Sequence, residues 1–285
     1  MALHQQGQLG LAAALYQKIL KQEPEHFDAL HLLGVIELQR KNFAAAVLFI
    51  DRAVKINSKY APAHANIGNA LRELKRHEEA LSSYERALLI SPDYPEALND
   101  RGNTLFELKR LEEALASYDR ALAIRPDYAE ALNNRGNALF GLKRHQEALA
   151  CYEHALALKP EFAEALNNCG NALFELKRHQ DALASYDAAL AIKPNYVEAF
   201  YNRGNTLFEL QRYEEALASY DRSLAIKPDY PEALSNRGNA LHQLKRHEVA
   251  LASYDRALAI RPDYAEALHN RSNVLRDLKE SASQH

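Results

Sequence analysis

The feature that most constrains this chain is a period of 34 residues. Proline stands at positions 92, 126, 160, 194, 228 and 262, always 34 residues apart, and Pro24 extends the series with Ser58 in the one missing place. The segment LASYDRALAIRPDYAEAL begins at residue 115 and recurs unchanged at residue 251, four periods later. Self-similarity at a fixed period of this length predicts a solenoid, in which each repeat packs mainly on its neighbours.

Each period contains two runs of small and apolar residues at helical spacing. In residues 95–128 the first run is Leu98, Gly102, Leu105 and Leu108, and the second is Ala114, Leu115, Tyr118, Ala121 and Leu122. The turn Lys109-Arg110 separates them, so we expect two antiparallel helices per unit, helix A and helix B. Pro126 ends helix B, and Asp127 with Glu130 has the spacing of a capping box for the next helix A.

This pattern resembles the tetratricopeptide repeat family, whose signature positions are occupied here by Gly102, Ala114, Tyr118, Ala121 and Pro126. The resemblance implies an all-α fold, a right-handed superhelical solenoid of antiparallel helix pairs, with residues 1–285 forming a single domain. Seven full units are expected, at 27–60, 61–94, 95–128, 129–162, 163–196, 197–230 and 231–264. Residues 1–26 are expected to form a partial leading repeat and residues 265–285 a closing helix.

Composition and motifs argue against catalysis, metal binding and general attraction to nucleic acid or membranes. The net charge is -3, no apolar run approaches the ~20 residues of a membrane span, and no signal peptide is evident, so a cytoplasmic location is expected. Cys151 and Cys169 are interpreted as small packed thiols. Four histidines occupy A–B turns a full repeat or more apart, a spacing that reflects copying: His77, His145, His179 and His247. No nucleophile, zinc or phosphate-loop motif occurs, so we expect neither an enzyme nor a cofactor.

Asparagine recurs at two positions of helix A, on the side opposite the signature residues. The first asparagine series is Asn66, Asn134, Asn168, Asn202, Asn236 and Asn270, with Asp100 in the remaining unit. The second asparagine series, three residues on, is Asn69, Asn103, Asn137, Asn171, Asn205, Asn239 and Asn273. In the tetratricopeptide family this side of helix A lines the concave groove. Solvated filler is the alternative for the first series, and capping or bridging to the neighbouring helix A for the second.

An asparagine amide offers a donor and an acceptor, which together match one peptide group. Packed helices lie ~8–10 Å apart, and extended chain advances ~3.3–3.6 Å per residue. One asparagine per repeat could therefore grip about every third residue of an extended peptide. The phenylalanine series, Phe106, Phe140, Phe174 and Phe208, is expected at the groove's edge, either contacting a ligand or packing between units.

The asparagine pattern is similar to that of the repeat arm of O-linked N-acetylglucosamine transferases and their bacterial SPINDLY-like relatives, which holds substrates by their main chain. The leading hypothesis is a non-enzymatic scaffold that binds proteins or peptides in extended conformation. The alternative is the substrate-recruiting arm of a longer glycosyltransferase. A chaperone adaptor would need basic residues in the groove, which this chain lacks. An RNA-binding solenoid would need a basic groove, which is absent from the sequence as well.

Two charged series have structural interpretations. Glu96, Glu130, Glu164, Glu198, Glu232 and Glu266 have the spacing of helix caps, with an acidic stripe as the alternative. Arg101, Arg135, Arg203, Arg237 and Arg271 are expected to form salt bridges between repeats.

Overall fold

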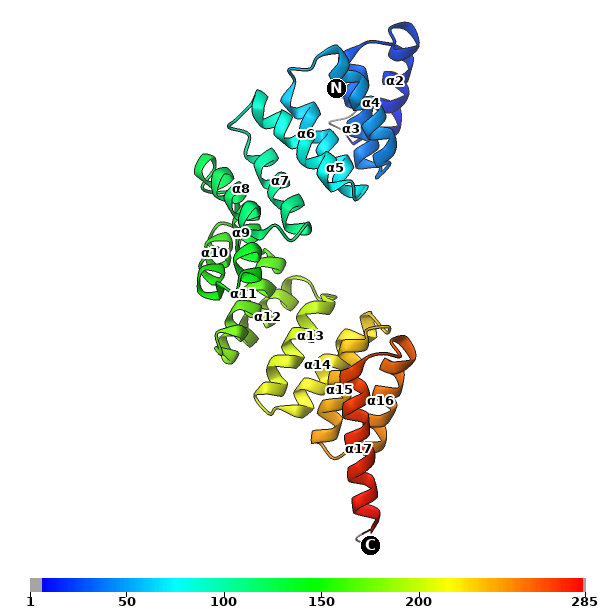
Figure 1. Ribbon diagram of the computed structural model, residues 1–285, viewed down its shortest axis with the longest axis vertical. Helices are drawn as coiled ribbons and strands as arrows, with labels where there is room; N and C mark the ends of the chain where they lie inside the picture. Colours follow the sequence, from blue (N-terminus) through cyan, green and yellow to red (C-terminus); the bar gives the residue numbers. More distant parts are fainter. Residues whose placement is uncertain (1–6, 284–285) are drawn as a thin grey trace. The chain divides into compact units, whose positions relative to one another are not determined.

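The computed structural model describes residues 7–283, and every helix in this range belongs to the expected pattern (Figure 1). Residues 1–6 of the predicted leading repeat and 284–285 of the closing helix lie outside the described residues. The described part contains sixteen α-helices and no strand. No helix in it combines the length and apolar character needed to cross a membrane.

The helices fall into two compact units, which meet in sequence between Leu142 and Lys143. The first unit contains α2 (Leu9–Gln22), α3 (Phe27–Gln39), α4 (Phe43–Ile56), α5 (Ala61–Glu73), α6 (His77–Ile90), α7 (Pro95–Glu107), α8 (Leu111–Ile124) and α9 (Ala129–Gly141). The second contains α10 (His145–Leu158), α11 (Ala163–Glu175), α12 (His179–Ile192), α13 (Val197–Glu209), α14 (Tyr213–Ile226), α15 (Pro231–Gln243), α16 (His247–Ile260) and α17 (Ala265–Ser283).

Within each unit, consecutive helices pack side by side as antiparallel pairs joined by short turns (Figure 1). The all-α fold of stacked helix pairs is thereby confirmed. The grouping of all repeats into a single domain stays a prediction.

In five helix pairs the core contains a tyrosine packed on a glycine. Tyr118 of α8 is 1% exposed, and a Cβ added at Gly102 of α7 would lie 2.5 Å from its Cε1 atom. Only glycine lets the ring approach the helix A backbone so closely. The same contact joins Gly68 to Tyr84, Gly170 to Tyr186, Gly204 to Tyr220, and Gly238 to Tyr254.

Every A–B turn contains one residue with positive φ, between 57° and 62°, which is a lysine in all but one case: Lys41, Lys75, Lys109, Lys143, Lys177, Gln211 and Lys245. In the turn after α7, the N–H of Lys109 donates to the Phe106 carbonyl at 3.0 Å, and that of Arg110 to the Leu105 carbonyl at 2.9 Å. These two bonds form a Schellman motif, with lysine at the position where glycine is usual.

The predicted capping boxes are wrong. Helix α9 begins at Ala129 with Tyr128 at its N-cap, and no side chain caps it. Two of the glutamates instead pair with an arginine that follows helix B of the same repeat: Glu96 accepts from Arg125 at 2.6 Å, and Glu232 from Arg261 at 2.6 Å. The chain therefore uses the carboxylate to link the two ends of a helix pair.

The predicted salt bridges between repeats are confirmed. Each joins helix A of one repeat to helix B of the repeat before it: Arg135 to Asp119, Arg203 to Asp187, Arg237 to Asp221, and Arg271 to Asp255, at 2.6 to 2.7 Å. Arg101 lies 3.9 Å from Glu85 in the same relation. Both cysteines are buried free thiols, as expected, and burial raises the pKa of Cys169.

Candidate functional site

The second asparagine series connects helix A to helix B of the same repeat. The tyrosine hydroxyl on helix B donates to Oδ1 of the asparagine on helix A, at 2.6 to 2.9 Å. The pairs are Tyr84 with Asn69, Tyr118 with Asn103, Tyr186 with Asn171, Tyr220 with Asn205, and Tyr254 with Asn239. A buried hydroxyl needs a partner, so these amides have a structural role within the repeat. The alternative interpretation anticipated a bridge to another helix A, and the tyrosine partner was not foreseen.

The first asparagine series donates from Nδ2 to the preceding helix A. Asn134 donates to Asn99 Oδ1 at 3.0 Å, and Asn202 to Asn167 Oδ1 at 3.1 Å. Asn66 lies 3.2 Å from His31 Nε2 in the same relation. The series therefore forms a hydrogen-bonded link between adjacent repeats.

Two neighbouring series members bond differently. Asn236 donates both to Tyr201 Oη at 3.2 Å and to Asn205 Oδ1 at 2.9 Å. Asn270 donates to Asn239 Oδ1 at 2.9 Å. Here the first and second series are joined into one network of side-chain amides.

Two acceptors of these links, Asn99 and Asn167, belong to a third set of polar residues on helix A. Asn99 and Asn167, and Asn133 at the same place in another repeat, are only 1% to 5% exposed. They immediately precede the first series, and the paired asparagines at 133–134 and 167–168 were the available signal. Two adjacent residues of a helix are rotated by about 100° about its axis. This rotation makes the amide of the third set buried and the amide of the first series half-buried.

All residues of the two asparagine series and the phenylalanine series that we expected at the groove are half-buried. Phe106 and Phe208 each pack against a buried cluster while keeping part of the ring accessible. The two interpretations of this series, ligand contact and packing between units, are therefore compatible in one side chain.

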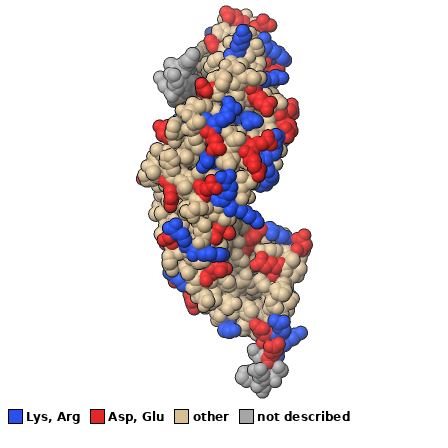
Figure 2. Space-filling view, turned by 60° about the vertical axis from the view of Figure 1, so that its left-hand side comes forward, with Lys and Arg blue, Asp and Glu red and all other residues tan. Residues whose placement is uncertain are grey.

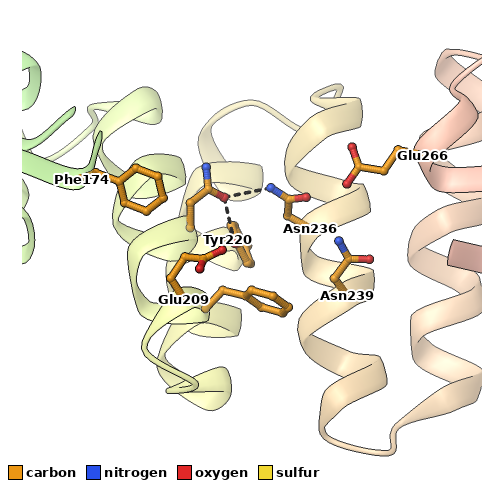
Figure 3. Close-up of a pocket in the computed structure, with 8 residues that line it drawn as sticks. Phe174, Glu209, Tyr220, Asn236, Asn239 and Glu266 are labelled. Atoms are coloured by element: carbon orange, nitrogen blue, oxygen red, sulfur yellow. Dashed lines mark hydrogen bonds between the residues drawn. The ribbon is translucent and has the colours of Figure 1, made fainter. Parts of the chain in front are cut away.

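Each unit contains a pocket that brings part of the expected set together. In the first unit a pocket of about 280 Å³ is lined by Arg72, Asn103, Phe106, Glu107, Tyr118, Asn134 and Asn137. In the second unit a pocket of about 290 Å³ is lined by Phe174, Asn205, Phe208, Glu209, Tyr220, Asn236, Asn239 and Glu266 (Figure 3). We call them the α7–α9 pocket and the α13–α15 pocket. The members of the three series outside these two pockets are Asn66, Asn69, Asn168, Asn171, Asn202, Asn270, Asn273 and Phe140.

The two pockets are equivalent places in the repeat, three periods apart. Asn103, Phe106 and Glu107 correspond to Asn205, Phe208 and Glu209, and Tyr118 to Tyr220. Arg72 in the α7–α9 pocket corresponds to Phe174 in the α13–α15 pocket. The two pockets thus share these amide and aromatic residues and differ at a position that is the cation Arg72 in the first unit and the ring of Phe174 in the second.

Charge near the α7–α9 pocket is balanced internally. Arg72 Nε lies 3.9 Å from Glu107, and Lys75 Nζ lies 3.2 Å from the same carboxylate. Burial raises the pKa of Asp100, which replaces asparagine in the first series, while Arg72 and hydrogen bonds from Asn69 and Asn99 act in the opposite direction. On the face of the molecule shown in Figure 2, acidic and basic side chains are interspersed without a large region of one sign.

Stacked helix pairs of fixed length define the class of helical repeat solenoids. Within this class, tetratricopeptide repeat patterns match residues 68–109, 102–143, 170–211, 204–245 and 238–278, and also 129–162 and 1–62. The chain belongs to the tetratricopeptide repeat family.

Solved structures share the fold. The APC/C hetero-tetramer Cut9-Hcn1 is 17% identical with a TM-score of 0.74, over 92% of this chain and 52% of that one. YrrB, a TPR protein with an unusual peptide-binding site, is 26% identical with a TM-score of 0.55, over 67% of this chain and 99% of that one. PilF of Pseudomonas aeruginosa is 20% identical with a TM-score of 0.67, over 75% and 97%. This chain spans about half the length of the Cut9-Hcn1 chain, and no curated protein matches it.

Proposed function

We propose that this protein is a non-enzymatic cytoplasmic scaffold that holds partner proteins by extended segments of their main chain. Its family consists of protein-interaction repeats, and YrrB, a similar structure, is described as having a peptide-binding site. The net charge of -3 gives no general attraction to nucleic acid.

The observation that carries the proposal is that two asparagines of α15 use different atoms of their amides in bonds within the protein. Both hydrogens of the Asn236 amide are used, toward Tyr201 and Asn205, so the amide offers its oxygen as an acceptor. Both lone pairs of Asn239 Oδ1 are used, by Tyr254 and Asn270. Within the described residues its NH2 group has no recorded bond, so it is the donor.

One acceptor and one donor, three residues apart on one helix, match the N–H and C=O of a peptide main chain. The bonds that fix the two amides also orient them before a ligand arrives, which lowers the entropic cost of binding. Recognition of this kind reads the backbone and tolerates many side chains. It refines the sequence-based hypothesis, in which every asparagine offered both a donor and an acceptor.

The test is the substitution Asn239→Asp, which keeps an oxygen for Tyr254 and Asn270 but removes the NH2 donor. The probe is a fluorescein-labelled pool of peptides of about 12 residues, which extend to roughly 40 Å, with glutamine at the centre and mixed Ser, Thr, Ala and Val elsewhere. Fluorescence anisotropy should show about tenfold weaker binding. This change in affinity corresponds to the loss of one hydrogen bond between neutral groups from a preorganised donor.

The matched control is Asn195→Asp, an exposed position in a junction where other repeats carry aspartate, such as Asp127 and Asp229. It adds the same charge away from the pockets and should leave the affinity unchanged. A second probe pool, N-methylated at alternate residues, should bind at least tenfold more weakly because half of its main-chain N–H donors are removed. Equal binding of both pools, or of the wild type and Asn239→Asp, would contradict main-chain recognition.

A second candidate is the substrate-recruiting arm of a longer enzyme related to O-linked N-acetylglucosamine transferases, favoured by the recurring asparagines of helix A. The intact mass of the protein in its source cell distinguishes the two. A species at the 32.1 kDa of this chain supports the free-standing scaffold, and a much heavier species supports the arm.

A further inference from the structure

The α13–α15 pocket combines aromatic rings with two carboxylates (Figure 3). Phe174 and Glu266 approach it from opposite sides, with Asn236 and Asn239 between them in this view. Its volume of about 290 Å³ equals that of roughly ten water molecules in the liquid, which is enough for one long side chain. The pocket is therefore a place for a ligand side chain beside the amides that hold the main chain.

The equivalent α7–α9 pocket shows what a satisfied version of this site looks like. There Glu107 has two cations of its own, Lys75 at 3.2 Å and Arg72 at 3.9 Å. Arg72 is also one of the residues that line this pocket. A bound segment meets a carboxylate there that the protein has already neutralised.

In the α13–α15 pocket the internal counter-ion is missing. Phe174 stands in the place of Arg72, and Lys177, which corresponds to Lys75, has its ammonium 5.8 Å from the centre of the Phe174 ring. For Glu209, within the described residues, no lysine or arginine comes within salt-bridge distance. Glu266 accepts a hydrogen bond from the neutral Tyr264 hydroxyl at 3.3 Å.

We propose that the α13–α15 pocket accepts a basic side chain, lysine or arginine, from the extended segment bound by the asparagines. The proposal rests on the proposed function and adds side-chain selectivity to it. Glu209 and Glu266 supply the opposite charge, and the ring of Phe208 supplies a face for a cation. Arginine fits both features, because its planar guanidinium stacks on rings and bonds to carboxylates in pairs.

The experiment uses three probe pools of the same design as above, with arginine, glutamine or glutamate fixed at the centre. The wild-type chain should bind the arginine pool about tenfold more tightly than the glutamine pool, and the glutamate pool least tightly. Glu209→Gln should reduce the affinity for the arginine pool to that for the glutamine pool. The control, Glu214→Gln, removes the same charge from the exposed first turn of α14 and should keep the preference.

A second variant copies the first unit into the second. Phe174→Arg places a cation at the position that corresponds to Arg72 in the α7–α9 pocket and should abolish the preference for arginine. Far-UV circular dichroism of each variant establishes that the helices are intact. Equal binding of the arginine and glutamine pools by the wild type would overturn the basic-residue proposal and leave main-chain binding standing. Absence of binding to every pool would overturn both, and a preference retained by Glu209→Gln would exclude this pocket.

Discussion

Repeats 27–60 and 95–128 form the same helix pair around different side chains. In repeat 95–128, Tyr118 packs on Gly102 and donates to Asn103 at 2.8 Å. In repeat 27–60, Ile50 packs on Gly34, and Val35 stands where the asparagine would be. Ile50 and Tyr118 are equally buried, at 0% and 1% exposed.

The difference shows that tyrosine and asparagine act as a pair. A buried hydroxyl without an acceptor costs more than an apolar side chain of similar shape, so tyrosine requires the asparagine, and isoleucine makes it unnecessary. Glycine is common to both repeats because the close approach of helix B requires it in either case. The conserved element of the hairpin is thus the space at glycine, and the polar pair is an addition to it.

The largest expected effect follows from removing that space. Gly102→Ala would place a Cβ 2.5 Å from Tyr118 Cε1 and 2.8 Å from Cδ1 and Cζ, and a buried ring has little room to move. We expect a loss of about 3 kcal/mol in the free energy of unfolding, measured by urea-induced loss of helical circular dichroism. Gly10→Ala is the control, since the nearest atom to its Cβ is 4.0 Å away. A loss no larger than that of the control would mean that the ring contact is not tight.

A valine in place of Asn103 gives repeat 95–128 the residue that repeat 27–60 has at this position. Asn103→Val leaves the Tyr118 hydroxyl buried without its acceptor and should cost about 1–3 kcal/mol. Adding Tyr118→Phe removes the orphaned hydroxyl and should recover most of that loss, giving a favourable coupling energy in a double-mutant cycle. Additive losses would show that the two residues do not depend on each other.

The repeat period predicted the helices closely because the same residue pattern recurs in each unit. Glycine, tyrosine and proline at fixed offsets are enough to place helix A, the turn and helix B. The groove side was harder to predict. Asn99 and Asp100 are adjacent in sequence, yet only the first serves as a buried acceptor for the following repeat, at Asn134. Sequence periodicity gives the face of a helix, while the partners of a side-chain amide depend on the distance to the next helix and on which atoms it has already bonded.

The two repeats also differ at the position of Asp100. Repeat 27–60 has Leu32 there, and most other repeats have asparagine. Burial raises the pKa of Asp100, against the opposing effects of Arg72, Asn69 and Asn99. A carboxyl whose pKa is higher in the folded state contributes stability below its unfolded pKa and loses it as pH rises through the folded pKa. Asp100→Asn should therefore stabilise the protein at neutral pH by up to about 1 kcal/mol.

The gain from Asp100→Asn should shrink as the pH falls through the raised pKa of Asp100 in the folded state, because the wild-type carboxyl takes up its proton there. Urea unfolding at several pH values measures this difference. Asp93→Asn, at an exposed junction, is the control and should show no such pH-dependent gain. A gain that grows on acidification would mean that Arg72 stabilises the carboxylate more than burial disfavours it.

The smallest expected effect concerns a feature that the two repeats share. Lys41 and Lys109 have φ of 60° and 62° in their A–B turns, a conformation in which the Cβ of a lysine is strained and glycine is not. Lys41→Gly and Lys109→Gly should each stabilise the chain by about 0.5 kcal/mol, the relief of strain being partly offset by the greater freedom of glycine in the unfolded chain. Lys109→Ala, which keeps the Cβ, should give no gain and serves as the matched control. Because main-chain bonds from the N–H groups of residues 41–42 and 109–110 close both turns, the gain should be the same whether isoleucine or tyrosine fills the hairpin. A gain confined to one of the two repeats would show that the turn senses the core beneath it, and the hairpin would then have to be treated as one unit in which turn and core depend on each other.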